Sequence, residues 1–546
     1  MPSYQRRYFS SMSNKTESNL IPNTFSMSKS NNAISRFLRE GVSHFTVHIF
    51  ERTWCTYLLL SLVFIVINLL TLTNVLPWID EVMFLDTSYN AVFHHSWTTT
   101  AWYRVAGEYP FSTYPPIYQF LVSMWMWLFG SDLLVVRSLN LLIVFVLGGL
   151  CLRMLKTSGL HLSIWFVAMF TLLLWGTSEM AWMYRNGRPD MLCALVFAFT
   201  TYTIERFFRS NSLKTRLAIV LSSALLVGTG LQTIPYLGLL WLFLFLILRK
   251  RSKEVLRLLL LLVIGLFLGI LFVALFMYAH GKLVGFAGSI VSYSATLSKI
   301  ALQLLPWAGE TFNFSAQPFI QKLLEQTPSL SFLERLSSVV ECRSFIILSI
   351  EGLLVYTLTF RKYLKSLLND KGFLLLVFAI SVPIMMNIAG RFATYYWWMA
   401  FLPLIISILL IVSKQRWALI VFSVTTLLLS VESVKFMFSN NHKDYENLCH
   451  FVERQNFSPA DKVVAPFMMF YEIKPLCDTC YFVGIFPTEF IGHVDYVIDV
   501  SEGDEFDQRI TAYVSQLQKD PNLILTKIDS CEHPSLSLYK VLKIHD

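Results

Sequence analysis

The sequence predicts a polytopic α-helical membrane protein that ends in a small soluble α/β domain. Hydrophobic residues make up 55% of its 546 residues. Charged residues make up only 15%, whereas a soluble chain carries about 25%. The mean hydropathy of +0.55 agrees with a chain that lies mostly in lipid. Only the last part, 438–546, alternates short strand and helix patterns as a soluble domain does.

Apolar runs of about 17–25 residues mark the candidate crossings. They fall at 55–76, 132–152, 161–178, 191–208, 217–232, 235–248, 256–279, 344–360, 372–388, 393–412 and 417–436. Clusters of Lys and Arg lie between these runs, at 153–156, 205–216, 249–254, 361–365 and 413–416. Basic residues concentrate in cytoplasmic loops, so a cytoplasmic N-terminus places all five clusters inside and the C-terminus outside. The net charge of +8 therefore reflects topology, and no nucleic-acid partner is expected.

Three parts of the chain follow from these patterns. Residues 1–50 are rich in Ser and Asn and predict a disordered cytoplasmic tail. Residues 51–437 predict the transmembrane domain, with extracytoplasmic loops at 77–113 and 280–343, and the remainder is the extracytoplasmic α/β domain. A further apolar segment, 114–130, is short for a crossing. It is either an interfacial or re-entrant helix or an extra span, which makes about 11–13 transmembrane helices in all.

Four of the eight cysteines lie in the C-terminal domain: Cys449, Cys477, Cys480 and Cys531. An extracytoplasmic location permits disulfides. The Cys-x-x-Cys spacing alone is a weak zinc or redox signal, and a structural role is favoured.

Two adjacent carboxylates, Asp80 and Glu81, stand where the first apolar run reaches water. They either end a helix or face an extracytoplasmic cavity. Asp190 begins a later apolar run. It either caps that helix or faces the same cavity and helps Asp80 to hold a metal or an acceptor.

Basic residues also lie at the predicted outer ends of spans, against the general bias. They are Arg137, Arg185, Arg188 and Arg391. A guanidinium binds phosphate through forked hydrogen bonds. Each arginine alone is better explained as a snorkelling anchor, but four on one side favour an anion site.

The order of short motifs along the chain resembles a known superfamily. The acidic pair is followed by YPPIY (114–118), LFG (128–130) and VRSLN (136–140). These motifs resemble the GT-C glycosyltransferases of the protein O-mannosyltransferase type, a glycosyltransferase family 39-like pattern. The turn GRFATY (390–395) is similar to a Gly-Lys-x-x-Thr-Tyr segment of the lipid A aminoarabinose transferases, from the same superfamily. The likeness is best over 78–210 and 389–405.

The resemblance implies an enzyme that takes a sugar from a polyprenyl-phosphate carrier on the outer face, with inversion at the sugar carbon. Asp80 matches the base that acts on the acceptor hydroxyl, and Glu81 would position the acceptor. Arg137 matches an Arg of the mannosyltransferase pattern. Arg391 and Tyr395 match the Lys and Tyr that lie near the lipid phosphate.

The chain also departs from both patterns. Pro115 stands where the aminoarabinose transferases have a Lys, and Tyr114 replaces the His of the mannosyltransferases. The soluble MIR repeats of eukaryotic protein mannosyltransferases are absent. A bacterial-type enzyme with a different acceptor is therefore expected.

The predicted protein is a multi-pass enzyme of the plasma (inner) membrane, in contact with membrane lipid. Its partners would be a polyprenyl-phosphate-linked sugar and a lipid, glycan or protein acceptor. No cofactor is certain, and a divalent metal is left open. Two alternatives are a surface-polysaccharide ligase or polymerase, which differs in the acceptor, and a secondary transporter. Transporters place charges near the bilayer midplane, whereas the polar groups here gather on one side. A non-catalytic scaffold is a third alternative.

Overall fold

A computed structural model of the chain describes residues 52–99, 101, 115–160, 162–281, 283, 342–360, 370–388, 396–439, 442–482, 491, 493–500 and 507–544. The predicted cytoplasmic tail, most of loop 280–343 and most of the turn at 389–396 lie outside these ranges.

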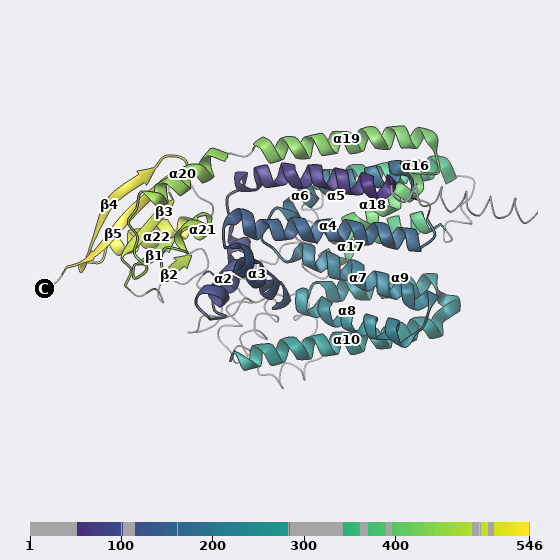
Figure 1. Ribbon diagram of the computed structural model, residues 1–546, viewed down its shortest axis with the longest axis horizontal. Helices are drawn as coiled ribbons and strands as arrows, with labels where there is room; N and C mark the ends of the chain where they lie inside the picture. Colours follow the sequence, from purple (N-terminus) through teal and green to yellow (C-terminus); the bar gives the residue numbers. More distant parts are fainter. Residues whose placement is uncertain are drawn as a thin grey trace, which may run out of the picture. The chain divides into compact units, whose positions relative to one another are not determined.

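The predicted apolar runs fold as helices, and each of the eleven falls on one of them (Figure 1). The first helix is Arg52–Asn74, ending in the 3₁₀ turn η1 (Leu72–Asn74). It is followed by α4 (Leu133–Thr157), α5 (Ile164–Gly176), α7 (Asp190–Arg209), α8 (Leu213–Thr229), α9 (Thr233–Ile247), α10 (Ser252–Ala279), α16 (Arg343–Phe360), α17 (Lys371–Ile388), α18 (Trp398–Val412) and α19 (Arg416–Ser439). A basic 3₁₀ turn, η2 (Arg249–Arg251), separates α9 from α10.

Length and composition separate these helices into two groups. Among the described residues, five helices are long and apolar enough to cross a bilayer: the first helix, α4, α7, α10 and α19. A sixth forms if α5 and the short α6 (Ser178–Tyr184), bent by 61°, make one broken span. Others are shorter, such as α9 and α18 with 15 residues each. The chain is a polytopic helical membrane protein, and the total of 11–13 crossings stays a prediction.

Local sequence explains how several helices begin and pack. The hydroxyls of Ser163 and Ser212 accept hydrogen bonds from backbone N–H groups in the first turns of α5 and α8. Gly265 and Gly269, one turn apart on α10, lie against α8. A Cβ on Gly269 would stand 2.6 Å from the carbonyl oxygen of Ala224. Such small residues at four-residue spacing let two membrane helices approach closely.

Two segments predicted as loops or interfacial elements contain helices. The first loop holds α2 (Ile79–Phe93), and the segment 114–130 holds α3 (Ile117–Phe129). With 13 residues, α3 is shorter than the roughly 20 that a crossing needs. It packs against α2, α4 and α8. This favours the interfacial or re-entrant interpretation over an extra span.

The C-terminal part forms the small α/β unit that the sequence predicts. Its five-stranded sheet has the order β2-β1-β3-β5-β4, with parallel pairing among the first three and antiparallel pairing among the last three. The strands are β1 (Lys462–Ala465), β2 (Thr479–Phe482), β3 (Tyr496–Val500), β4 (Leu523–Cys531) and β5 (Leu536–Lys543). The remaining elements are α20 (His442–Glu453), η6 (Phe467–Met469), α21 (Phe470–Ile473) and α22 (Asp507–Gln518). The sheet has its own apolar core, which includes Val464, Val497, Ile510 and Val541.

All eight cysteines are free. The disulfides that the sequence permitted in the C-terminal part are therefore not formed in this structure.

Contacts join the helical bundle to the C-terminal part, and Thr56–Asp546 forms one compact unit. The Asn74 side chain, at the end of the first helix, donates a hydrogen bond of 3.1 Å to the Met437 carbonyl near the end of α19. α20 packs against η1, and η6 packs against α2. Figure 1 shows α20 and α21 on the side of the C-terminal part that is nearest to the helical bundle.

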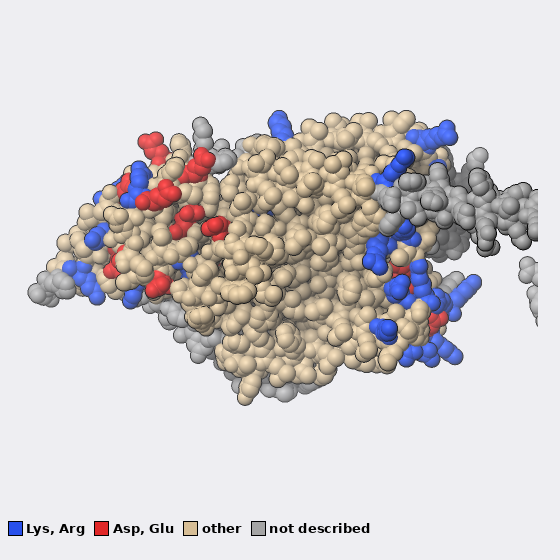
Figure 2. Space-filling model, in the orientation of Figure 1, with Lys and Arg blue, Asp and Glu red and all other residues tan. Residues whose placement is uncertain are grey.

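Charge is distributed unequally over the bundle. Figure 2 shows Lys and Arg side chains gathered at one end, where α7 ends and α8 and α10 begin. On α4, Arg137 lies near the start and Lys156 near the end, about 29 Å apart at the usual rise per residue. This is close to the thickness of the apolar part of a bilayer, about 30 Å. The first turns of α4 and α7 are thus separated by a membrane's thickness from the basic ends of the same helices.

Candidate functional site

The carboxylates predicted at the end of the first span lie in the first turn of α2 and face different surroundings. The side chain of Asp80 is 23% exposed, whereas that of Glu81 is completely buried. Neighbouring residues on a helix are rotated by about 100° from each other, so two adjacent acids cannot share one environment. Acidic residues in a first turn also interact favourably with the positive end of the helix dipole.

Glu81 is the centre of a buried hydrogen-bond cluster. Arg137 donates from Nε to Oε1 at 2.8 Å and from Nη2 to Oε2 at 2.6 Å. The Gly187 N–H donates to Oε1 at 3.0 Å, and the Tyr471 hydroxyl donates to the same oxygen at 3.2 Å. The forked pair with Arg137 is the strongest geometry available to a carboxylate. The cluster therefore holds the first turn of α2 to α4, to the loop before α7 and to the C-terminal part.

Arg137 is fully buried, and its described contacts are all with the protein. Beyond Glu81, its Nη1 donates to the carbonyl oxygens of Leu72 at 2.6 Å and Val75 at 2.7 Å. These two carbonyls belong to the frayed end of the first helix, where backbone acceptors need partners. This arrangement favours a role in holding in place the acidic turn, which is the first turn of α2 with Asp80 and Glu81. A contact between Arg137 and the donor phosphate stays a prediction.

Gly187 allows the backbone to approach α2. A Cβ at this position would stand 2.6 Å from Leu85 Cδ1 and 3.1 Å from Glu81 Cγ. Only a residue without a side chain lets the N–H at this point reach the carboxylate. Asn140 on α4 fixes the same loop from the other side, by donating 3.0 Å to the Arg188 carbonyl.

The exposed carboxylate belongs to a second ion-pair group. Arg188 pairs with Asp80 through Nη1, and its Nε donates to Asp190 Oδ2 at 2.8 Å. Its guanidinium also lies over the rings of Trp78 and Phe84, at 5.4 and 5.2 Å. Asp190 is the first residue of α7 and is completely buried. Asp190 thus lies in the same group as Asp80, joined to it through Arg188. A role of Asp190 toward a metal or an acceptor stays a prediction.

The structure brings together five of the eight predicted site residues: Asp80, Glu81, Arg137, Arg188 and Asp190. The other three, Tyr114, Arg391 and Tyr395, lie outside the described residues, so their roles stay predictions.

Arg185, the remaining basic residue noted in the loop before α7, is also buried. It donates to Asn68 Oδ1 at 3.0 Å and to Thr71 Oγ1 at 2.8 Å. It therefore supports the end of the first helix and does not point into solvent.

Three functional candidates were not found from the sequence: Tyr471, Lys474 and Asp86. Lys474 Nζ lies 3.0 Å from Asp86 Oδ1, with side chains 1% and 0% exposed. Asp86 also accepts a hydrogen bond of 2.7 Å from the Thr99 hydroxyl. A signal was present, because Lys474 is the only basic residue in the apolar run FMMFYEIKPL (467–476). A lysine in such a run needs a buried partner.

No group of three or more His, Cys, Asp or Glu side chains that could hold a metal ion occurs in the described part of the chain. In the acidic turn each carboxylate is paired with an arginine. The described residues therefore offer no such group for a divalent metal, and the question of metal dependence stays open.

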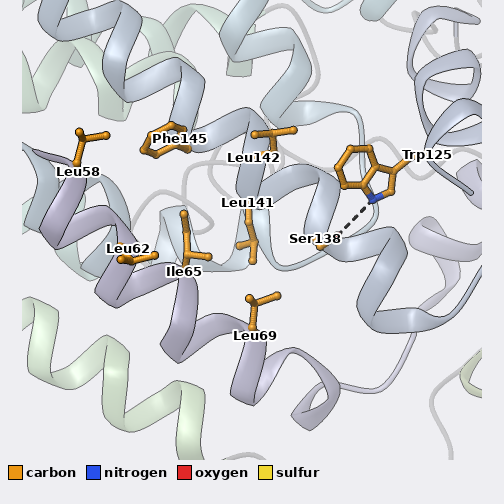
Figure 3. A pocket seen from close by; sticks show the side chains of 9 residues that line it. All are labelled: Leu58, Leu62, Ile65, Leu69, Trp125, Ser138, Leu141, Leu142 and Phe145. Atoms are coloured by element: carbon orange, nitrogen blue, oxygen red, sulfur yellow. Dashed lines mark hydrogen bonds between the residues drawn. The ribbon is translucent and has the colours of Figure 1, made fainter. Parts of the chain in front are cut away.

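An apolar groove of about 490 Å³ lies between the first helix, α3 and α4 (Figure 3). It is lined by Leu58, Leu62, Ile65, Leu69, Trp125, Ser138, Leu141, Leu142 and Phe145. Its polar atoms are largely satisfied within the wall, since the Trp125 indole N–H donates to Ser138 Oγ at 3.2 Å. From Leu58 to Leu69 the groove follows the first helix for about 16 Å. It ends one turn before Leu72, whose carbonyl accepts from Arg137.

The chain was compared with protein families, curated proteins and solved structures. No protein-family model matches the chain, and no curated protein does. Among solved structures, ArnT from Cupriavidus metallidurans bound to undecaprenyl phosphate aligns with 13% identity over 88% of this chain and 97% of its own, at a TM-score of 0.46. The archaeal oligosaccharyltransferase AglB from Archaeoglobus fulgidus, in complex with an inhibitory peptide and a dolichol-phosphate, aligns with 12% identity over 82% of this chain and 69% of its own, at a TM-score of 0.50.

The likeness to AglB establishes a shared fold. The chain has the architecture of the GT-C membrane glycosyltransferases, and the fold class predicted from sequence is confirmed. At 12% identity the likeness concerns the fold alone.

Proposed function

We propose that the protein is an integral-membrane glycosyltransferase that moves a sugar from a polyprenyl-phosphate carrier to an acceptor hydroxyl on the extracytoplasmic face. The observation that carries the proposal is the environment of Asp80. It is the one partly exposed carboxylate of the described acidic turn. The helix that carries it, α2, lies at the end of the bundle opposite the end where Lys and Arg side chains gather (Figures 1 and 2). A general base has to reach a substrate, and the buried carboxylates of Glu81 and Asp190 cannot.

In the proposed reaction, the oxygen of the acceptor hydroxyl attacks the anomeric carbon while the Asp80 carboxylate takes the proton of that hydroxyl. The bond between that carbon and the phosphate oxygen breaks at the same time. The lipid phosphate leaves with the bonding electrons, and the sugar carbon inverts. Arg188 holds Asp80 from one side, which fixes the carboxylate in the direction of attack.

The leaving phosphate gains negative charge, so cations should stabilise it. Arg188 is already paired with Asp80 and Asp190. Arg391 and Tyr395 remain the candidates for this contact, on the strength of the sequence resemblance. The apolar groove between the first helix, α3 and α4 is suited to the carrier's hydrocarbon chain, because its lining is apolar and it ends one turn before Leu72, whose carbonyl accepts from Arg137.

The hydrogen bonds around Glu81 support an indirect role for this residue. Its four hydrogen bonds come from the protein, so it positions the acceptor only indirectly, by fixing the turn that carries Asp80. The ArnT and AglB structures hold undecaprenyl phosphate and dolichol-phosphate. These are the classes of carrier to try first, and the sugar and the acceptor are to be found by screening.

The test uses purified protein in lipid with radiolabelled polyprenyl-phosphate sugars. Wild type should release the sugar from its carrier, and Asp80→Asn should do so about 10²–10⁴-fold more slowly. Asp132→Asn is the matched control, because Asp132 is an exposed carboxylate at the start of α4. It should turn over like wild type.

Equal rates for wild type and Asp80→Asn would remove Asp80 as the base. If folded wild type released sugar from none of the carriers, the transferase proposal would fail. A transport assay across sealed vesicles would then be the next experiment. A polysaccharide product of many sugar units would instead favour the ligase or polymerase alternative.

A further inference from the structure

One segment of the C-terminal part, Phe467–Lys474, reaches the acidic turn of α2. It consists of η6 and α21 and directly follows strand β1. Six of its eight residues are buried, including Tyr471 and Lys474. The Phe470 ring also meets the Tyr89 ring of α2 edge-on, with centroids 6.2 Å apart. The segment is therefore packed into the bundle and is not a free surface loop.

The hydroxyl of Tyr471 is a hydrogen-bond donor to the acidic turn. It lies 3.2 Å from Glu81 Oε1. Burial raises the pKa of Tyr471 well above its usual value, and the nearby Glu81 carboxylate raises it further. The phenol therefore keeps its proton at neutral pH and donates a hydrogen bond, which the Glu81 carboxylate accepts.

A buried ion pair holds the same segment one turn further along α2. Lys474 Nζ lies 3.0 Å from Asp86 Oδ1, and both side chains are withdrawn from solvent. Asp86 receives further hydrogen bonds from the Thr99 hydroxyl at 2.7 Å and the Ala101 N–H at 3.2 Å. Removing one partner of a buried pair leaves an uncompensated charge, so such a contact strongly favours the docked arrangement.

We propose that Tyr471 is a positioning residue of the transfer site, and that the Lys474–Asp86 pair docks the segment that carries it. The C-terminal part then sets the geometry of the Asp80–Glu81 turn, because the carboxylate that it contacts is adjacent in sequence to the proposed base. This inference rests on the proposed function. It predicts that the segment acts on the rate of the chemical step and leaves the donor's affinity unchanged.

Tyr471→Phe removes only the hydroxyl and keeps the ring that packs in the segment. We expect kcat to fall roughly tenfold, since a small misplacement of a catalytic group is costly. The KM for the lipid-linked donor should stay within about twofold, because uniform binding is untouched. Tyr539→Phe is the matched control. Tyr539 lies on β5 and packs against the apolar core of the sheet, outside the segment Phe467–Lys474, and kcat should not change.

The Lys474–Asp86 pair is tested by two substitutions of Lys474, one that removes its charge and one that keeps it. Lys474→Met should lower kcat at least as much as Tyr471→Phe, whereas Lys474→Arg keeps the cation and should restore most of the rate. An unchanged kcat in Tyr471→Phe would overturn the proposal. A raised donor KM with normal kcat would also overturn it, because Tyr471 would then contact the donor.

Hydrogen exchange separates this inference from the proposed function, since it needs no turnover. Backbone amides of the first turns of α2 should exchange faster in Tyr471→Phe and in Lys474→Met than in Tyr539→Phe or wild type. Equal exchange in all four proteins would refute the positioning role even if the protein proves not to be a transferase. Faster exchange with no transferase activity in wild type would refute only the proposed function.

Discussion

The two ends of the helical bundle use ion pairs in different ways. At the acidic turn, Arg137 and Glu81 are both completely buried. At the basic end, Arg209 pairs with Glu205, and their side chains are 46% and 20% exposed. The exposed pair lies in water or among headgroups, where it gains little. The buried pair costs desolvation, so its value lies in fixing one arrangement of three distant segments.

The burial of an ion pair indicates which charges to connect with function. Basic residues at the α7–α8 and α9–α10 connections are explained by membrane topology. Buried, mutually paired charges around α2 are not, and they surround the one described acid of that turn that a substrate can reach. Substitutions at either end of the bundle test whether burial decides how much an ion pair contributes.

The largest effect on stability is expected for Arg137→Met. This change leaves Glu81 buried without its cation and leaves the Leu72 and Val75 carbonyls without a donor. We expect a loss of about 3–5 kcal/mol in the free energy of unfolding. Denaturation in detergent micelles, followed by tryptophan fluorescence, measures it. The double variant Arg137→Met/Glu81→Met should regain much of the loss, and a neutral single variant would contradict the role given to this pair.

A smaller, functional difference is expected between two arginines of the acidic side. Arg391→Ala should raise the KM for the lipid-linked donor more than Arg188→Ala does, by roughly tenfold for a lost forked phosphate contact. The reason is that Arg188 is already engaged by Asp80 and Asp190. Arg188→Ala should instead lower kcat. Steady-state kinetics over a range of donor concentrations separate the two effects, and equal donor affinity in Arg391→Ala and wild type would exclude Arg391 from the phosphate site.

The smallest effect is expected at the basic end. Arg209→Gln removes the exposed pair with Glu205 and should change stability by less than about 0.5 kcal/mol. The same denaturation experiment reports it. A loss comparable with that of Arg137→Met would mean that burial does not distinguish the two ends.

Much of the fold follows from the sequence because a bilayer imposes strong rules. Apolar length and basic loops located the helices, and alternating patterns located most elements of the C-terminal part. The acidic turn was also predictable, since Asp80 and Glu81 follow an apolar run directly. The 3.6-residue period alone does not reveal that these neighbours differ so much in burial.

Contacts over long sequence separations could not be predicted in the same way. The hydrogen bond between Tyr471 and Glu81 joins residues 390 positions apart. Its only sequence trace is a run of apolar residues that carries a lysine and ends near a proline. Likewise, the sequence predicts Arg137 as a functional cation, but which of several carboxylates it pairs with depends on three-dimensional packing.

The separation between Glu81 and its partners gives the site an order of assembly. Arg137 follows Glu81 after 56 residues and Gly187 after 106, whereas Tyr471 follows only after 390. At about 5–20 residues per second of synthesis, the last contact becomes available roughly 20–80 s after the first carboxylate has been made. Arg137 and Gly187 are thus available to the acidic turn early in synthesis, whereas the segment that carries Tyr471 is made late. Under the proposed function, a chain that ends before Tyr471 would lack one of the contacts that fix the turn and would not act on a lipid-linked sugar.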